Sequence, residues 1–144
     1  MSEQNIDHSE APEGRALVDL IAAEFFAKKA EDVTLVEFNG VSNVCDRFLI
    51  ATCQSEPQIR AILSSLSRIL SRKGVKPLGT DHYQGSRWAV LDLGELMVHL
   101  FEAEHRKFYS LERLWPDATK EQLNAADYAR TEDTTEEKLD NEYL

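Results

Sequence analysis

Hydrophobic and polar positions follow helical and strand-like spacings in turn along this chain. Residues 16–30 place leucine, isoleucine and phenylalanine near one helical face, which predicts a first helix. Residues 33–38 have the β-branched character of a strand, and a second strand is expected over 46–53. Asn39-Gly40 lies between them and favours a tight turn, because both residues tolerate positive φ. The pattern therefore predicts a helix followed by two neighbouring strands.

The clearest predicted element is the helix that follows Ser55. The stretch Ser-Glu-Pro-Gln is a capping box, in which side chains satisfy free amides at a helix start. Six apolar side chains then recur at helical spacing: Ile59, Ile62, Leu63, Leu66, Ile69 and Leu70. Gly74 suits the position just past the helix end. This helix is predicted to cover the core.

The second half of the chain predicts a hairpin. After Pro77 a loop is expected, and residues 87–93 and 96–101 then read as two strands joined around Gly94-Glu95. A short helix is expected near Glu102, and a weak helix over 118–129. The order of elements predicts one α/β or α+β domain, with a mixed sheet flanked by helices.

Charge divides the 144 residues into a neutral domain and two acidic ends. Residues 1–14 carry a net charge of −4, residues 117–144 carry −6, and residues 15–116 balance 13 acids with 13 Lys and Arg. We therefore expect an acidic flexible tail over 1–14, a domain over 15–116, and an acidic extension over 117–144 that is weakly helical and then disordered. The net charge of −10 does not prevent the neutral domain from approaching a nucleoprotein.

Compartment and redox state follow from a few absences in the sequence. The N-terminal residues do not follow a basic region with an apolar one, and no apolar run approaches the ~20 residues of a membrane span. Cys45 and Cys53 lack the spacing of a metal or redox motif, so two buried thiols are expected. A cytoplasmic protein is predicted.

Catalytic and metal-binding patterns are weak. His99 and His105 match no metal motif, and His99 is expected to be a buried, hydrogen-bonded histidine in a strand. The sequence contains no GxSxG elbow, no Walker loop, no GxGxxG fingerprint and no Asp-x-Asp pair. We therefore predict no catalytic residue, no metal and no cofactor.

Apolar and aromatic residues favour a binding surface instead. Trp88 shares a strand face with Val90 and Asp92, and core packing and surface exposure are equally compatible with its position. Leu93 lies at the hairpin tip, where burial within the domain is difficult. Trp, Tyr and Arg are enriched at binding hot spots, and residues 105–115 are rich in them. On the long helix, Arg60, Arg68 and Arg72 suit either a solvated face or a phosphate-binding stripe.

Four stretches resemble the ribosomal silencing factor family, also called Iojap-like: DRFLIATCQS, PLG, RWAVLDLGELMVHLF and EHRKFYSLERLW. The resemblance runs from about residue 16 to residue 115. It implies a nucleotidyltransferase-like topology without the catalytic carboxylates. It also implies a translational repressor that docks on the L-fourteen protein of the large ribosomal subunit, blocks joining of the small subunit when nutrients are scarce, and often pairs as a homodimer when free.

The resemblance also implies which residues face the partner. The family's partner-facing positions fall on Trp88, Leu93 and Tyr109, with Asp92, Gly94 and Arg106 at neighbouring motif positions. Asp46 and Ser55 match the family too, but capping and turn roles explain them better. The chain departs from the family at Asp81-His82, where many members have Glu-Gly, and the lost glycine bears on the loop's conformation.

The alternative hypothesis is an enzyme. It is a metal-dependent nucleotidyltransferase that would use Asp46, Asp92 or Glu95.

Overall fold

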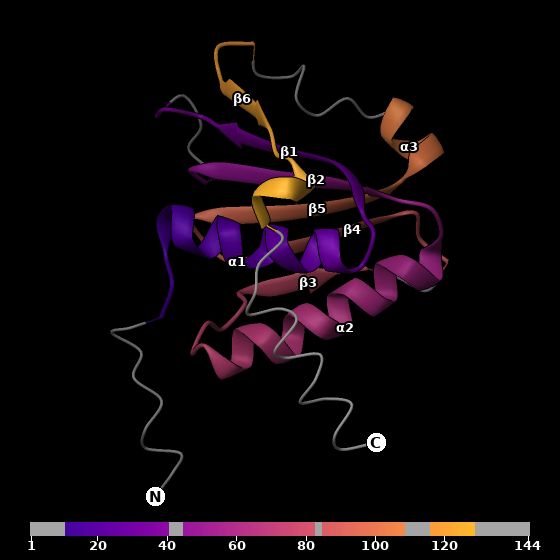
Figure 1. The fold of residues 1–144 in the computed structure, drawn as a ribbon, viewed down its shortest axis with the longest axis horizontal. Helices are drawn as coiled ribbons and strands as arrows, with labels where there is room; N and C mark the ends of the chain where they lie inside the picture. Colours follow the sequence, from indigo (N-terminus) through magenta and orange to yellow (C-terminus); the bar gives the residue numbers. More distant parts are fainter. Residues whose placement is uncertain (1–10, 41–44, 83–84, 109–115, 129–144) are drawn as a thin grey trace, which may run out of the picture.

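The computed structural model describes residues 11–40, 45–82, 85–108 and 116–128. Its order of elements is α1 (Gly14–Ala27), β1 (Glu31–Glu37), β2 (Arg47–Cys53), α2 (Glu56–Arg72), β3 (Gly79–Asp81), β4 (Trp88–Asp92), β5 (Leu96–Glu102), α3 (Ala103–Phe108), β6 (Thr119–Gln122) and the 3-10 helix η4 (Ala125–Tyr128). One mixed sheet has the strand order β3-β4-β5-β2-β1-β6 (Figure 1). The predicted mixed α/β fold is confirmed.

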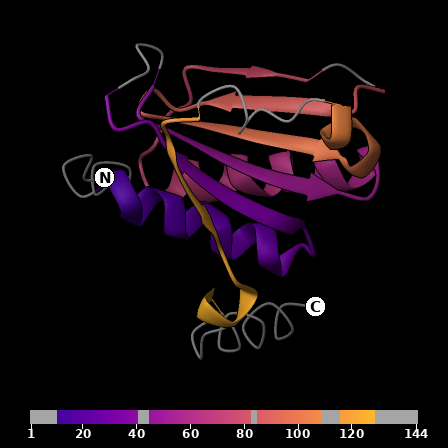
Figure 2. The same cartoon turned by 90° about the horizontal axis from the view of Figure 1, so that it is seen from above.

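Helices α1 and α2 cover one face of this sheet, and Figure 2 shows both on the same side of the strands. Their buried apolar side chains pack against alternate residues of the four central strands, including Leu35, Leu49 and Leu100. The other face carries a second buried cluster, formed by Val36, Phe38, Cys45, Phe48, Ile50, Phe101 and Ala118. We call the first the helix side of the sheet and the second the open side.

Local sequence signals explain the ends of α2. The Ser55 hydroxyl accepts a hydrogen bond from the Gln58 amide over 3.3 Å, as in a capping box. The Gln58 side chain differs from the prediction, because its oxygen accepts from the Gln54 amide instead of the Ser55 amide. Gly74 follows the helix with φ of 77°, a conformation that favours glycine. Four of the six predicted apolar residues are buried, and Leu63 and Ile69 are half-buried.

The first helix ends earlier than predicted. Residues 16–30 were expected to be helical, but α1 stops at Ala27 and Lys29 adopts a φ of 70°. The Ala30 amide then donates to the Phe25 carbonyl over 2.9 Å, which ends the helix with a left-handed turn. The strand β1 can therefore begin immediately at Glu31.

The predicted weak helix over 118–129 is wrong. Thr119–Gln122 form strand β6, which pairs antiparallel with β1, and only Ala125–Tyr128 are helical. Pairing with an open sheet edge offers this segment long-range hydrogen bonds that outweigh its weak helical pattern. Leu123 and Tyr128 are buried after β6, so the folded unit extends beyond residue 116.

The segment after Pro77 also differs from the prediction of a loop. Gly79–Asp81 form a short edge strand, β3, which pairs antiparallel with β4. The predicted hairpin of β4 and β5 and the short helix after Glu102 are confirmed.

Candidate docking surface

Strand β4 presents three half-buried side chains on the open side of the sheet, those of Trp88, Val90 and Asp92. Its residues alternate between half-buried and buried, with Ala89 and Leu91 pointing to the helix side. Trp88 and Val90 lie on the open side, and Met97 continues the same surface on β5. We call Trp88, Val90 and Met97 the β4 face. It is an apolar strip that the rest of the described chain leaves partly accessible to a partner.

Two contacts with described residues help to hold the Trp88 side chain in place. Its indole stacks on Phe101, with ring centroids 4.9 Å apart, and Phe101 is completely buried. Its Nε1–H donates to Nδ1 of His99 over 3.2 Å. The two contacts fix the orientation of the ring, so a partner would meet a preorganised aromatic surface.

His99 is a buried histidine, as predicted. It is 5 % exposed, and burial lowers its pKa to about 4. Because Nδ1 accepts from Trp88, the neutral ring carries its proton on Nε2, which has no hydrogen-bond partner among the residues that the structure describes. This arrangement suits a structural support for Trp88. It does not suit a general base, because the accepting nitrogen is already occupied.

Asp92 and Gly94 shape the turn between β4 and β5. The Asp92 carboxylate accepts from the Gly94 amide over 2.9 Å, and the Leu93 amide donates to the Leu96 carbonyl over 2.9 Å. Gly94 has a φ of 91°, which side-chain-bearing residues rarely adopt. Both residues therefore define the position of Leu93, whatever contacts they make with a partner.

Leu93 and Trp88 lie at opposite ends of β4 and do not form one patch. Leu93 is half-buried and packs against the helix-side cluster, whereas Trp88 packs against the open-side cluster. The intervening strand separates their Cα atoms by roughly 17 Å. The two residues could contact one partner only if that partner reached around the β3–β4 edge of the sheet.

Leu78 lies at this edge and was not singled out from the sequence. It is 74 % exposed, and its amide donates to the Asp92 carbonyl over 2.8 Å, which places it beside the hairpin turn. A Cβ added at Gly94 would meet a Leu78 methyl at 3.7 Å. A large apolar residue at such exposure next to Leu93 extends the apolar surface along the edge.

Arg106 lies inside the protein. It is 7 % exposed, and its guanidinium donates to the Asp32 carbonyl, the Thr52 hydroxyl and the Thr34 hydroxyl over 2.6, 2.9 and 3.0 Å. The side chain thus fastens α3 to β1 and β2. The resemblance places Arg106 among the partner-facing positions, but the structure gives its guanidinium acceptors within the domain.

The remaining predicted sites have varied positions. Tyr109 and residues 110–115 lie outside the described residues. Asp46 is exposed, and Glu95 accepts from the Gly14 amide over 2.9 Å and pairs with Arg47 at 3.8 Å. In the described parts of the chain, no group of three His, Cys, Asp or Glu side chains could hold a metal ion.

Both cysteines are buried free thiols, as predicted. Burial raises the pKa of Cys53 to about 12 and also raises that of Cys45. Neither thiol therefore has the character of a nucleophile at neutral pH.

The Asp81-His82 departure has a structural explanation. His82 Nε2 lies 3.2 Å from the Ser86 carbonyl and 3.6 Å from a carboxylate oxygen of Glu56, and the His82 side chain is 7 % exposed. The imidazole thus connects the loop to the start of α2. A glycine at this position would lack both contacts.

The fold and the described surface define a mixed α/β domain with an apolar strand face of the kind that binds another macromolecule. A family model described as "Ribosomal silencing factor during starvation" matches residues 9–143. The chain belongs to this ribosomal silencing factor family.

Individual relatives agree with this assignment. A ribosomal silencing factor of Halalkalibacterium halodurans is 38 % identical over 96 residues, which cover 67 % of this chain and 82 % of the relative. The ribosomal silencing factor of Bacillus subtilis is 33 % identical over 104 residues, which cover 72 % of this chain and 88 % of the relative. A crystal structure from Bacillus halodurans superposes with a TM-score of 0.66 at 34 % identity, covering 76 % of this chain and all of that one.

Within the described ranges, no helix is long and apolar enough to cross a bilayer.

Proposed function

We propose that this chain represses translation by binding the large ribosomal subunit through its L-fourteen protein, so that the small subunit is sterically prevented from joining. The family assignment is the observation that carries the proposal. The proposal is also supported by the preorganised apolar surface, which suits a protein that docks on a partner. Docking of this kind requires no catalytic turnover. Nutrient limitation is the condition under which we expect the repression, and the cytoplasm is where we expect it.

The proposed contact surface contains the β4 face and the β3–β4 edge. Trp88 offers an amphipathic ring on the open side, and Leu93 with Leu78 offers aliphatic side chains at the turn. Tyr109 belongs to the proposal through the family resemblance. Asp92 and Gly94 act by holding the turn, and Arg106 acts by holding α3. When no ribosome is present, the same apolar surface could pair two copies of the chain.

Subunit joining provides the direct test. Purified subunits are mixed with and without the protein and separated on a sucrose gradient. We expect the protein to raise the fraction of free subunits and to sediment with the large one. An unchanged gradient would contradict the proposed function.

A pair of matched variants tests the surface. Leu93→Ala is expected to weaken large-subunit binding by more than ~1 kcal/mol. Leu20→Ala is the control, because Leu20 is also half-buried and packs against the same helix-side cluster, but lies on α1. Equal losses in the two variants would show that Leu93 acts only through stability.

A further inference from the structure

The outer side of α2 carries a one-sided set of charges. Between residues 57 and 77 every charged side chain is a cation, and all of them are exposed: Arg60, Arg68, Arg72, Lys73 and Lys76. The opposite side of the helix is buried in the core through Ile59, Ile62, Leu66 and Leu70. The cations therefore face solvent together. We call these five residues the α2 basic face.

Helical geometry arranges the arginines in a row. Arg60, Arg68 and Arg72 belong to one series of positions spaced four residues apart. Residues at this spacing are neighbours on the surface of a helix. At 1.5 Å per residue, the row extends for about 18 Å from Arg60 to Arg72. Such a row can follow an extended line of negative charge.

The described residues neutralise few of these cations. Arg60 pairs with Glu56 at 2.9 Å, whereas Arg68 donates to the neutral Ser64 hydroxyl over 3.3 Å and has no ion pair with a described carboxylate. Arg72, Lys73 and Lys76 have no ion pair with any carboxylate in the part of the chain that the structure describes. Four cations without acidic partners among the described residues therefore gather on one side of a domain that is neutral overall.

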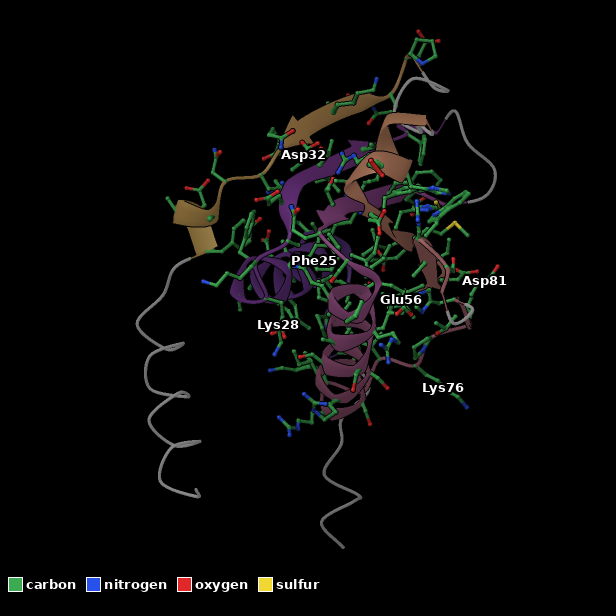
Figure 3. The ribbon with its side chains drawn as sticks, turned by 90° about the vertical axis from the view of Figure 1, so that its right-hand side faces the viewer. Phe25, Lys28, Asp32, Glu56, Lys76 and Asp81 are labelled. Atoms are coloured by element: carbon green, nitrogen blue, oxygen red, sulfur yellow. The ribbon has the colours of Figure 1, made fainter. Side chains whose placement is uncertain are left out.

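The α2 basic face continues toward the β3–β4 edge. Lys76 precedes the exposed Leu78 by two residues, and the Leu78 amide donates a hydrogen bond to the Asp92 carbonyl beside the hairpin turn. Figure 3 shows Lys76 pointing away from the molecule, near the end of α2 that is remote from Glu56. A partner that contacts Leu78 and Leu93 would therefore bring its neighbouring surface close to Lys76, Lys73 and Arg72.

We propose that the α2 basic face binds the phosphate backbone of large-subunit ribosomal RNA, next to the protein contact. This inference rests on the proposed function, since docking on the large subunit is what brings RNA to the face. Lys and Arg contacts to phosphate position a protein without reading bases. The expected contribution is thus independent of RNA sequence, salt-dependent, and added to the apolar contact at the edge.

Deproteinised large-subunit RNA separates this inference from the proposed function. The full chain is titrated with that RNA between 50 and 200 mM salt, and the double variant Arg68→Gln/Arg72→Gln is compared with the charge-matched control Lys29→Gln/Lys120→Gln. Loss of two phosphate contacts should lower the salt slope by about 1.4 to 1.8. Wild type should then lose roughly tenfold more affinity than the double variant over this salt range.

Each outcome has a defined meaning. A salt slope that falls equally in the double variant and in its control would overturn the inference, because only net charge would matter. The inference would also be overturned if the wild-type chain did not bind RNA. If RNA binding then appeared in the variant Glu136→Gln/Glu137→Gln, the ligand of the α2 basic face would be the chain's own acidic C-terminal residues instead of RNA. Leu93→Ala should leave binding to deproteinised RNA unchanged while weakening binding to whole subunits, which tests the proposed function separately.

Discussion

The indole of Trp88 donates a hydrogen bond to His99, and the two rings lie on neighbouring strands of the open side, with centroids 6.0 Å apart. His99 is buried by its surroundings while Trp88 remains half-buried. The pair therefore connects a candidate contact residue to the interior of the sheet. The strength of the Trp88–His99 hydrogen bond can be measured by substituting either residue.

Trp88→Phe keeps a ring to stack on Phe101 but removes the indole N–H. His99 Nδ1 then loses the donor that the described residues give it, so we expect the free energy of unfolding to fall by about 1–2 kcal/mol. Urea denaturation measures this loss. In a His99→Leu background the same substitution should cost markedly less, and additive costs would show that the hydrogen bond contributes little.

The depressed pKa of His99 predicts acid sensitivity. The pKa of His99 is about 4 in the folded protein and 6.5 for an unperturbed histidine, so the unfolded chain binds more protons between these pH values. The contribution of neutral His99 to the free energy of unfolding is therefore fully present above about pH 6.5 and is lost as the pH falls toward 4. Urea denaturation at pH 7 and pH 4.5 should differ by about 2–3 kcal/mol from this residue. His99→Gln should show a smaller difference, and an equal one would assign the acid loss to other groups.

Leu78→Ser tests the β3–β4 edge without disturbing the core. Because Leu78 is 74 % exposed, we expect the unfolding free energy to change by less than about 0.5 kcal/mol. Binding to large subunits should weaken by more than about 1 kcal/mol if Leu78 contacts the partner together with Leu93. Co-sedimentation measures the binding, and thermal unfolding serves as the control. Undiminished binding would exclude Leu78 from the contact surface.

Arg106→Lys should destabilise the fold. A single ammonium cannot reproduce the forked geometry by which Arg106 reaches Thr34 and Thr52, so we expect a loss of more than about 2 kcal/mol. Arg87→Lys is the matched control, because Arg87 forms an exposed pair with Glu102 at 3.6 Å and should matter little. Similar losses for the two variants would contradict a structural role specific to Arg106.

Local signals explain which parts of the fold were predictable. The Ser55 cap, the Asn39-Gly40 turn and the Gly94 turn each depend on residues close in sequence, and these elements appear as expected. Strand β6 depends on pairing with β1, which no local pattern reveals. The weak helical character of residues 118–129 was therefore misleading.

The candidate site shows the same division. Alternation along β4 placed Trp88 and Val90 on one face, as the structure has them. The burial of Arg106 required knowledge of Thr34 and Thr52, which are more than fifty residues away in the chain. Leu78 was missed because an isolated leucine in a predicted loop gives no periodic signal.

The pairing of β6 with β1 also sets an order of events during synthesis. Thr34 of β1 pairs with Gln122 of β6. Strand β1 is synthesised first, but its outer edge can form hydrogen bonds with β6 only after nearly all the described residues have been synthesised. Such distant pairing forms late and slows folding, because a long loop must close first. A nascent chain that ends before residue 119 would expose the hydrogen-bonding edge of β1, and an unpaired strand edge promotes aggregation. Completion of this domain is thus expected only after the C-terminal strand has been released.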